Sequence, residues 1–355
     1  MTAQSRKARI GVVGVGWWSC VNHIPALQAS DIADCVAICD LDTDRLAQVA
    51  AHFGIPAQYT DVTEMVRAEK LDGVIVATPH VAHRGPAVAA LEAGAHVMIE
   101  KPMATSAADA RAIEEAAIRN GRQVMIPTGY SFTRFTATAA QMVRAGRIGT
   151  IRHAICSMSS ALEDLMSGEP MVETTDHIFR PPPSTWADPA RAGGHGWGQL
   201  SHALGWLLHV GDIEFAEVAC MDVKSKTGVD FYDAAIARTT TGATVSLSGA
   251  STMPKHRGLH FEIRFFGTEG MLHFVSEAGE AKLVLSRQDG TDETPAIAAE
   301  EIGYDGMLPI PAFAALCAGI SDDNPANATI GRRVTEALDA LYRSAASGRI
   351  ERVSA

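Results

Sequence analysis

The stretch Gly11-Val12-Val13-Gly14-Val15-Gly16 decides the fold class of this chain. It continues the apolar run 9–13, which has the length and composition of a buried strand. A glycine loop between a strand and a helix allows a tight turn and brings backbone amides close to a phosphate. The third position of the Gly-x-Gly-x-x-Gly pattern is Ser19, which is small but is not glycine. The stretch therefore predicts the start of a dinucleotide-binding domain.

Short apolar runs alternate with helical patterns over residues 1–127. The runs after the first are 35–39, 74–77, 96–99 and 123–126. Helical patterns lie between them at 42–52 and 106–120, and Ser106 is a candidate N-cap of the second. Such alternation is typical of a doubly wound parallel sheet of the Rossmann type, so residues 1–127 are the predicted nucleotide-binding domain.

Residues 128–355 follow a different pattern, with β-rich runs at 217–223, 234–239, 244–247, 261–266 and 271–275. Gly242 and Gly267-Thr268-Glu269-Gly270 fit hairpin turns between these runs. Two helical patterns, 310–319 and 331–347, close the chain. We expect a C-terminal α+β domain with an open, mostly antiparallel sheet that serves substrate binding and oligomerisation. An open sheet face favours a homodimer or homotetramer.

The composition restricts the classes of function. The chain has 355 residues and a net charge of −11, which disfavours binding to nucleic acid or to an anionic membrane surface. No apolar run reaches the roughly 18 residues of a transmembrane helix. No signal-peptide pattern precedes the glycine loop. The six cysteines are scattered without a Cys-x-x-Cys pair, so we expect reduced thiols, no metal and a cytoplasmic protein.

An acidic residue, Asp40, follows the second apolar run about 26 residues after Gly14, near the spacing of a ribose-binding carboxylate. A carboxylate there accepts hydrogen bonds from the adenosine ribose and repels a 2′-phosphate, which favours NAD over NADP. Asp42 fits the N-cap of the next helix better, which leaves Asp40 free for the ribose. A neighbouring cation, Arg45, would relax this preference, so NADP stays possible.

The residues expected to border the cofactor follow the glycine loop and the next strands: Gly14, Gly16, Trp17, Trp18, Asp40, Thr78, Pro79, His80, Glu100 and Lys101. For Trp17 and Trp18 two interpretations stay open. They either form a wall beside the nicotinamide or the substrate, or they pack between domains. His83, one helical turn after His80, fits a structural role better.

A lysine follows the run 96–99 within the triplet Glu100-Lys101-Pro102. Open parallel sheets bind their ligands beyond the carboxyl ends of the strands, where this lysine lies. Pro102 confines Lys101 to extended backbone angles and permits a cis bond. A Lys-Pro pair alone would mark no more than the end of a strand. With the glycine loop upstream, we predict that Lys101 reaches the substrate beside a bound nicotinamide.

A second glycine-rich stretch, Gly193-Gly194-His195-Gly196-Trp197-Gly198, opens a helix that runs to about residue 209. His202 lies in its first turns, where the helix dipole favours a neutral imidazole that can hydrogen-bond a substrate hydroxyl. His195, His202 and His209 recur every seven residues, but no carboxylate stands at ligand spacing, so we expect no metal. The residues predicted to contact the substrate are Lys101, Tyr130, Trp186, His195, Trp197 and His202.

Together these motifs resemble the glucose-fructose oxidoreductase / myo-inositol dehydrogenase (Gfo/Idh/MocA) family. The matching pieces are Gly14-x-Gly16, 23–27, Ala77-Thr78-Pro79 with His83, 93–97, Glu100-Lys101-Pro102, Gly129-Tyr130, Gly193-Gly194 with His202, 267–270 and 344–349. The resemblance implies a Rossmann domain, an open-faced sheet domain, and hydride transfer to or from a carbon of a sugar, cyclitol or related diol. It also implies that Lys101 is the proton relay.

One position departs from the family pattern. Many relatives carry an aspartate four residues before the substrate histidine, where this chain has Gly198. His202 therefore lacks that acidic partner, and Lys101 lacks a charge that would stabilise its cation. We predict a lowered pKa for Lys101 that suits a base. A glycoside, an aromatic dihydrodiol or an amino sugar becomes as plausible a substrate as a cyclitol.

Three functions fit these residues. The leading hypothesis is an NAD(P)-dependent dehydrogenase that oxidises a secondary hydroxyl, with Lys101 and His202 as its catalytic residues. The second is a redox-recycling glycosidase or lyase, which oxidises, eliminates and returns the hydride, so that no NADH accumulates. The third is an NAD-binding sensor without activity, which the fold alone does not exclude. The presence of both Lys101 and His202 speaks against the sensor.

Overall fold

The computed structural model describes residues 6–353 and divides the chain into two compact units. Unit 1 comprises Met1–Pro127, Pro170–Pro182 and Gly306–Arg332. Unit 2 comprises Thr128–Glu169, Pro183–Asp305 and Arg333–Ala355. The chain thus first leaves unit 1 at residue 127, where the sequence patterns change. Two later segments return to unit 1, which the sequence patterns did not indicate.

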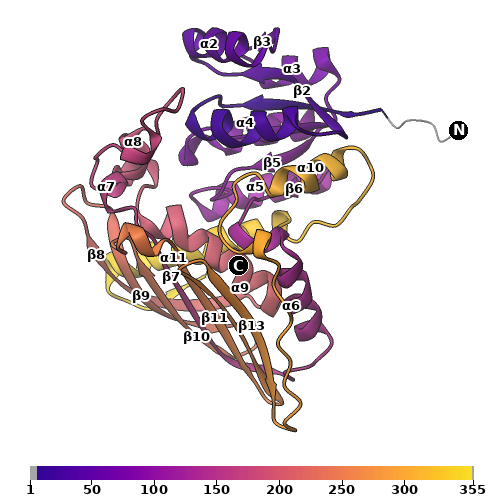
Figure 1. Cartoon of the computed structure of the whole chain (residues 1–355). Helices are drawn as coiled ribbons and strands as arrows, with labels where there is room; N and C mark the ends of the chain where they lie inside the picture. The colour runs from indigo at the N-terminus through magenta and orange to yellow at the C-terminus, as the bar shows by residue number, and fades with distance from the viewer. Residues whose placement is uncertain (1–5, 354–355) are drawn as a thin grey trace, which may run out of the picture. The chain divides into compact units, whose positions relative to one another are not determined.

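Unit 1 is built on a six-stranded sheet with the order β3-β2-β1-β4-β5-β6, and every neighbouring pair is parallel. Its strands are β1 (Ala8–Val13), β2 (Ala33–Cys39), β3 (Ala57–Tyr59), β4 (Gly73–Val76), β5 (His96–Ile99) and β6 (Val124–Met125). Helices cover both faces of this sheet (Figure 1). The strand order reverses between β1 and β4, which confirms the predicted doubly wound sheet.

The helices of unit 1 are α1 (Ile24–Gln28), α2 (Thr43–Phe53), α3 (Val62–Glu69), α4 (Arg84–Glu92), α5 (Ala107–Asn120) and α10 (Pro309–Cys317). Two of the caps follow the sequence signals. The Asp42 carboxylate accepts a hydrogen bond from Arg45 N (3.0 Å), and Ser106 Oγ accepts one from Asp109 N (3.2 Å). Each bond satisfies a backbone amide that the first helical turn leaves without a partner.

The late segment with α10 packs directly on the sheet of unit 1. A side chain at Gly73, at the start of β4, would lie 2.4 Å from Cys317 Sγ and 3.0 Å from the Phe313 ring. Phe313 is fully buried. Only glycine therefore lets α10 approach this strand so closely.

Unit 2 is built on an eight-stranded sheet with the order β13-β12-β11-β7-β10-β9-β8-β14. Its strands are β7 (Ile151–Ser159), β8 (Phe215–Lys224), β9 (Asp230–Thr239), β10 (Thr244–Ala250), β11 (His260–Gly267), β12 (Gly270–Glu277), β13 (Glu280–Arg287) and β14 (Glu351–Arg352). The pair β7–β10 is parallel and the other pairs are antiparallel. The predicted hairpin turns at Gly242 and at 267–270 are confirmed.

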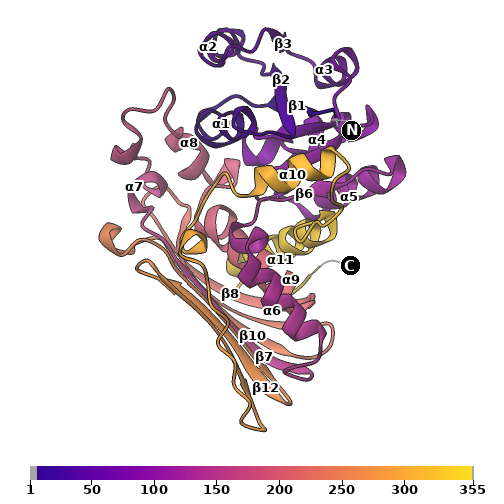
Figure 2. The ribbon, with the colours of Figure 1, turned by 45° about the vertical axis from the view of Figure 1, so that its right-hand side comes forward.

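Helices lie on one face of this sheet (Figure 2). They are α6 (Arg134–Arg144), α9 (Ser201–Gly211) and the part of α11 (Ala328–Ser347) that follows residue 332. Two short helices, α7 (Glu163–Met166) and α8 (Pro183–Trp186), lie in the loops. On the opposite face, side chains such as Met221 and Ile236 are 80% and 63% exposed. The sheet is therefore open on one side, as predicted.

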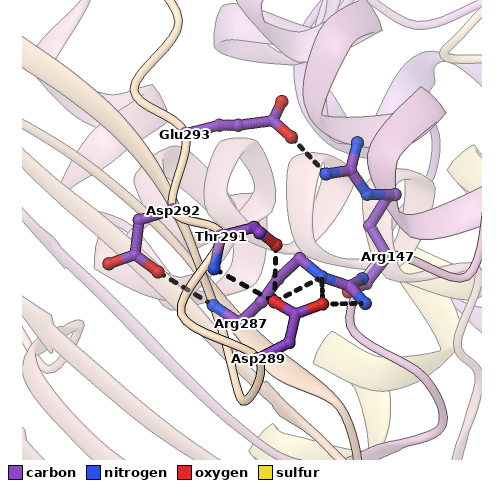
Figure 3. Close-up of polar contacts among 6 residues, drawn as sticks. All are labelled: Arg147, Arg287, Asp289, Thr291, Asp292 and Glu293. Carbon is purple, nitrogen blue, oxygen red and sulfur yellow. Dashed lines mark hydrogen bonds and ion pairs between the residues drawn. The ribbon is translucent and has the colours of Figure 1, made fainter.

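A polar cluster fixes the turn after β13 (Figure 3). Arg287 Nε and Thr291 N both donate to the Asp289 carboxylate (3.2 and 3.0 Å). The hydrogen bonds from Thr291 and Arg287 hold the pKa of Asp289 below its usual range. Arg287 also donates to the backbone carbonyl of Arg147 (2.6 Å), and Arg147 pairs with Glu293. The cluster thus joins this turn to the chain that follows α6.

Candidate active site

The glycine loop of unit 1 connects β1 to the helical turn Ser19–His23. Gly14 has φ 83°, and a side chain there would come within 2.7 Å of the backbone at Ala77 and Thr78. The side-chain direction of Gly16 is open, with no atom within 4 Å. Ser19 Oγ donates to the Gly14 carbonyl (2.6 Å), so the serine closes the loop with its hydroxyl. This loop leaves the space that a pyrophosphate needs, and it fits a dinucleotide.

Asp40 directly follows β2, beside this loop. Its Oδ2 accepts a hydrogen bond from Val15 N (3.0 Å), and its Oδ1 accepts one from Asp42 N (3.0 Å). Arg45 Nη1 lies 3.6 Å from the same carboxylate. Asp42, and not Asp40, caps the following helix, as the sequence predicted, and Asp40 accepts from two backbone amides instead. Each carboxylate oxygen retains a further lone pair, so Asp40 can still accept from ribose hydroxyls.

Glu100 lies at the centre of a buried polar group at the end of β5. Its Oε1 accepts from Trp18 Nε1 (2.9 Å) and lies 3.0 Å from His23 Nε2, while Oε2 accepts from Lys101 N (3.2 Å). Burial raises the pKa of Glu100, but the interaction with His23 and the charge of Lys101 outweigh it, so this pKa lies below its usual range. Glu100 thus holds Trp18 and the Lys101 backbone. The sequence patterns did not single out His23 as a site residue.

Lys101 is the central predicted site residue of unit 1. Its side chain is buried, and the whole residue is 8% exposed. Burial lowers the pKa of the ammonium to about 8, against the opposing effect of the Glu100 charge. The predicted lowering is therefore present, and its physical cause is burial. The peptide bond Lys101–Pro102 is cis.

His83 bridges the ends of two neighbouring strands. Its Nε2 lies 2.8 Å from the Thr78 carbonyl, after β4, and its Nδ1 lies 2.9 Å from the Pro102 carbonyl, after β5. The residue is 1% exposed, and burial lowers its pKa. This geometry confirms the structural role predicted for His83, because the neutral imidazole donates to one of these carbonyls and packs against the other, next to Lys101. His80 is buried as well, with its ring 6.2 Å from that of His83.

The two tryptophans after the glycine loop have different partners within unit 1. Trp17 Nε1 donates to His177 Nδ1 (2.8 Å), and the two rings stack at 6.3 Å with an interplanar angle of 18°. Trp18 instead points its indole nitrogen at Glu100, and its ring meets that of Trp17 edge to face at 5.2 Å. His177 belongs to the segment Pro170–Pro182, which carried no site prediction.

In unit 2, His202 is the second residue of α9, as predicted. A π-helical turn, Gly196–Leu200, leads directly into this helix. The His202 ring meets the Tyr304 ring edge to face at 5.3 Å. A side chain at Gly129 would lie 3.3 Å from His202 Cβ. His202 is therefore held closely by residues on either side of it, and Tyr304 is a neighbour that the sequence patterns did not indicate.

The position that departs from the family pattern, Gly198, packs against Trp186. A side chain at Gly198 would come within 2.7 Å of the Trp186 ring and 3.8 Å of the Met166 methyl group. Gly198 precedes His202 by four residues along the π-helical turn and α9, so the two lie on similar faces. The aromatic ring thus occupies the space that an aspartate would need at this position.

Two other predicted substrate residues, Tyr130 and Trp197, are also buried in unit 2. Tyr130 is 5% exposed, donates to or accepts from Ser276 Oγ (3.1 Å), and packs against Phe135, Phe261 and Phe274. Trp197 stacks on Tyr342 at 5.2 Å with an interplanar angle of 7°. Both rings thus pack against aromatic side chains of unit 2, and their contact with a substrate stays a prediction.

His195 lies in a buried titratable cluster beneath the turn that leads to His202. The residue is fully buried, and its Nδ1 lies 3.3 Å from Asp233 Oδ2. Burial lowers the pKa of His195 to about 4. Burial raises the pKa of Asp230 to about 6 and that of Asp233 to about 7, with the repulsion between the two carboxylates adding to the shift of Asp230. His195 is thus a neutral partner of acidic residues inside unit 2.

The described residues contain no group of three or more His, Cys, Asp or Glu side chains arranged to hold a metal ion. Residues 6–353 also include no helix long and apolar enough to cross a membrane.

The glycine loop, Asp40 and the strand order define an oxidoreductase-type Rossmann domain for a dinucleotide. Two protein-family models agree with this assignment. Residues 8–128 match the model of the oxidoreductase family with an NAD-binding Rossmann fold, and residues 136–273 match the C-terminal domain model of the same GFO/IDH/MocA family. The chain therefore belongs to this family, and its cofactor is NAD.

Relatives with known activities match parts of the chain. D-apiose dehydrogenase of Paraburkholderia graminis is 34% identical over 50% of this chain and 47% of its own length. The 1-carboxy-3-chloro-3,4-dihydroxycyclohexa-1,5-diene dehydrogenase of Comamonas testosteroni is 28% identical over 77% of this chain and 62% of its own length. In both cases the match spans less than two thirds of the relative.

Solved structures match nearly the whole chain. An oxidoreductase domain protein from Kribbella flavida has a TM-score of 0.77 and 21% identity, covering 99% of this chain and 100% of that one. A levoglucosan dehydrogenase solved with NADH and L-sorbose has a TM-score of 0.75 and 19% identity, covering 98% and 99%. At this identity the likeness shows the shared fold.

Proposed function

We propose that this protein is an NAD-dependent dehydrogenase that oxidises a secondary hydroxyl of a ring-shaped sugar, cyclitol, glycoside or related diol, with NADP as the alternative cofactor. The observation that supports this most strongly is the state of Lys101. Its amine lies at the carboxyl end of a parallel strand, is nearly buried and has a pKa of about 8. A positioned amine that loses its proton near neutral pH is suited to act as a general base.

Each predicted residue has a distinct role in this proposal. Lys101 Nζ accepts the proton of the substrate hydroxyl. Glu100 holds the backbone of that lysine by accepting from Lys101 N, and the His83 ring lies between the Thr78 and Pro102 carbonyls and donates to one of them. His202 orients the substrate oxygen. NAD, when bound, supplies the carbon that accepts the hydride.

The surroundings of His202 favour a particular class of substrate. Where many relatives carry an aspartate, this chain presents the Trp186 ring against Gly198. An aromatic face binds the C–H face of a ring better than it binds a row of hydroxyls, whose hydrogen bonds it cannot satisfy. A glycoside, a cyclic diol or a ring with an apolar face therefore fits this side of the site. Among the relatives, the Comamonas testosteroni enzyme carries a cyclic dihydroxydiene in its name.

The proposal is tested by following nicotinamide absorbance with purified protein, NAD or NADP, and a panel of cyclitols, hexoses, glycosides and cyclic dihydrodiols. A substrate-dependent rise that Lys101→Ala abolishes supports it. Product that forms without any net NADH would replace it with internal hydride recycling. The absence of any product across the panel while NAD binds normally would favour a sensor.

A further inference from the structure

The segment Pro170–Pro182 contacts the nucleotide-binding edge of unit 1, and no role in the site has been assigned to it. It interrupts unit 2 between Glu169 and Pro183, and by its contacts it belongs to unit 1. We call this segment the strap. Most of the strap is irregular, with one short 3₁₀ turn at Val172–Thr174.

The first contact of the strap lies next to the glycine loop. Its His177 accepts the hydrogen bond from Trp17 Nε1 (2.8 Å) and stacks on the Trp17 ring. Trp17 follows Gly16, the glycine whose side-chain direction is open. The strap is therefore fastened beside the place where the loop offers its amides to a pyrophosphate.

The second contact lies beside the predicted ribose site. The Phe179 ring centroid is 5.9 Å from the guanidinium carbon of Arg45. Arg45 in turn lies 3.6 Å from the Asp40 carboxylate and 3.1 Å from that of Asp42. These acidic groups hold the guanidinium in place, and both Phe179 and Arg45 are half-buried. The Phe179 ring of the strap thus contacts Arg45, and Arg45 in turn contacts the Asp40 carboxylate.

We propose that the strap is part of the cofactor site, and that Phe179 and His177 bind the adenosine diphosphate half of the dinucleotide. The two contacts lie next to the two groups of unit 1 that serve this half, the glycine loop and Asp40. An adenine ring stacks well on an aromatic face, because every purine presents a flat π-surface. The inference rests on NAD binding by unit 1 and not on the proposed dehydrogenase reaction.

The test measures the dissociation constants of NAD and of ADP-ribose by isothermal titration calorimetry. ADP-ribose carries the adenosine diphosphate half and lacks the nicotinamide. Phe179→Leu keeps apolar volume but removes the ring face, and it should weaken both ligands by the same factor, about 5- to 20-fold. Phe179→Tyr keeps the ring face and should bind both ligands as the wild type does. Val172→Ala, at a strap position 74% exposed, is the matched control and should change neither constant.

The opposite results would overturn the inference. If Phe179→Leu and His177→Ala bind ADP-ribose with the wild-type constant, the strap is only a packing element. A loss of NAD affinity with unchanged ADP-ribose affinity would place the strap at the nicotinamide instead. Lys101→Ala separates the two proposals, because it should abolish turnover while leaving ADP-ribose binding and the effect of Phe179→Leu unchanged.

Discussion

The Asp230 carboxylate accepts a hydrogen bond of 2.7 Å from the backbone N of Gly196 inside unit 2. The other oxygen of Asp230 accepts from Tyr342 Oη (2.7 Å), and that hydroxyl also accepts from Trp197 N (3.2 Å). Asp230 begins β9, Tyr342 lies in α11, and Gly196 begins the turn that leads to His202. The placement of His202 therefore depends on two residues far from it in sequence.

Removing the hydrogen bonds that Asp230 accepts from Gly196 and Tyr342 should destabilise unit 2. In Asp230→Asn one oxygen becomes an amide donor, so either Gly196 N or Tyr342 Oη loses its buried acceptor. We expect a loss of about 1–3 kcal/mol in the free energy of unfolding, measured by urea denaturation. Tyr342→Phe removes only one donor and should cost about 1 kcal/mol. Wild-type stability in both variants would show that the hydrogen bonds of Asp230 do not contribute to the free energy of unfolding.

The raised pKa values in the same cluster predict the sign of a pH effect. Asp233 has a folded-state pKa of about 7, well above the value of about 4 expected in the unfolded chain. The folded state therefore binds more protons, and this residue costs stability progressively as the pH rises from 4 to 7. Asp233→Asn removes that titration. Its stability relative to the wild type should increase over this range, measured by urea unfolding at several pH values; a constant difference would contradict the raised pKa.

The pH dependence of catalysis should report Lys101. Only the neutral amine accepts a proton, so kcat/KM should rise as the pH increases through about 8, the pKa of this lysine. Lys101→Arg keeps the positive charge but cannot lose it near neutral pH, and it should reduce kcat by about 10²-fold or more. NAD affinity, measured separately by calorimetry, should change little. An unchanged rate in Lys101→Arg would remove Lys101 from the chemistry.

Removing the charge of Glu100 should shift the pH profile of kcat/KM to lower pH. The Glu100 carboxylate raises the pKa of Lys101 and so opposes the effect of burial. Glu100→Gln preserves the shape and an acceptor for Trp18 but removes the charge. The pKa seen in the kcat/KM profile should therefore fall below that of the wild type. A shift to higher pH would show that another group controls the profile.

The contact between Gly198 and Trp186 predicts a coupled pair of substitutions. Gly198→Asp forces a side chain against the Trp186 ring, where the approach would be 2.7 Å, and should cost about 1–3 kcal/mol of stability. Adding Trp186→Ala opens that space, and the double variant should recover part of the loss. We expect it also to shift the ratio of kcat/KM from apolar-faced rings toward cyclitols. Independent, additive effects of the two substitutions would argue against the contact.

Local signals in the sequence predicted one part of this protein well. The alternation of apolar runs and helical patterns located β1, β2, β4 and β5, and the caps at Asp42 and Ser106 are present. These features depend on residues within a few positions of one another. The short β3 and the strands β7 and β13 were missed. Residues 151–159 carry arginine, histidine and serines among their apolar positions, so the alternation is weak there.

The residues of the candidate site likewise fall into those that the sequence located and those whose roles it did not indicate. The positions of Lys101 and His202 could be predicted because a strand end and a helix start are local events. The roles of His195 and Trp197 could not, since their surroundings are set by Asp233 and Tyr342, which are distant in the sequence.

By itself, the sequence determined the Rossmann fold, its glycine loop and the lysine at the end of β5, because backbone conformation and strand burial follow from short-range patterns. Only the tertiary structure decided that Trp186 fills the space beside Gly198, that Asp230 anchors the turn before His202, and that Phe179 lies against Arg45. Each of these is a contact between elements far apart in the chain. Such contacts depend on how these elements pack against one another, and no local sequence pattern encodes that packing.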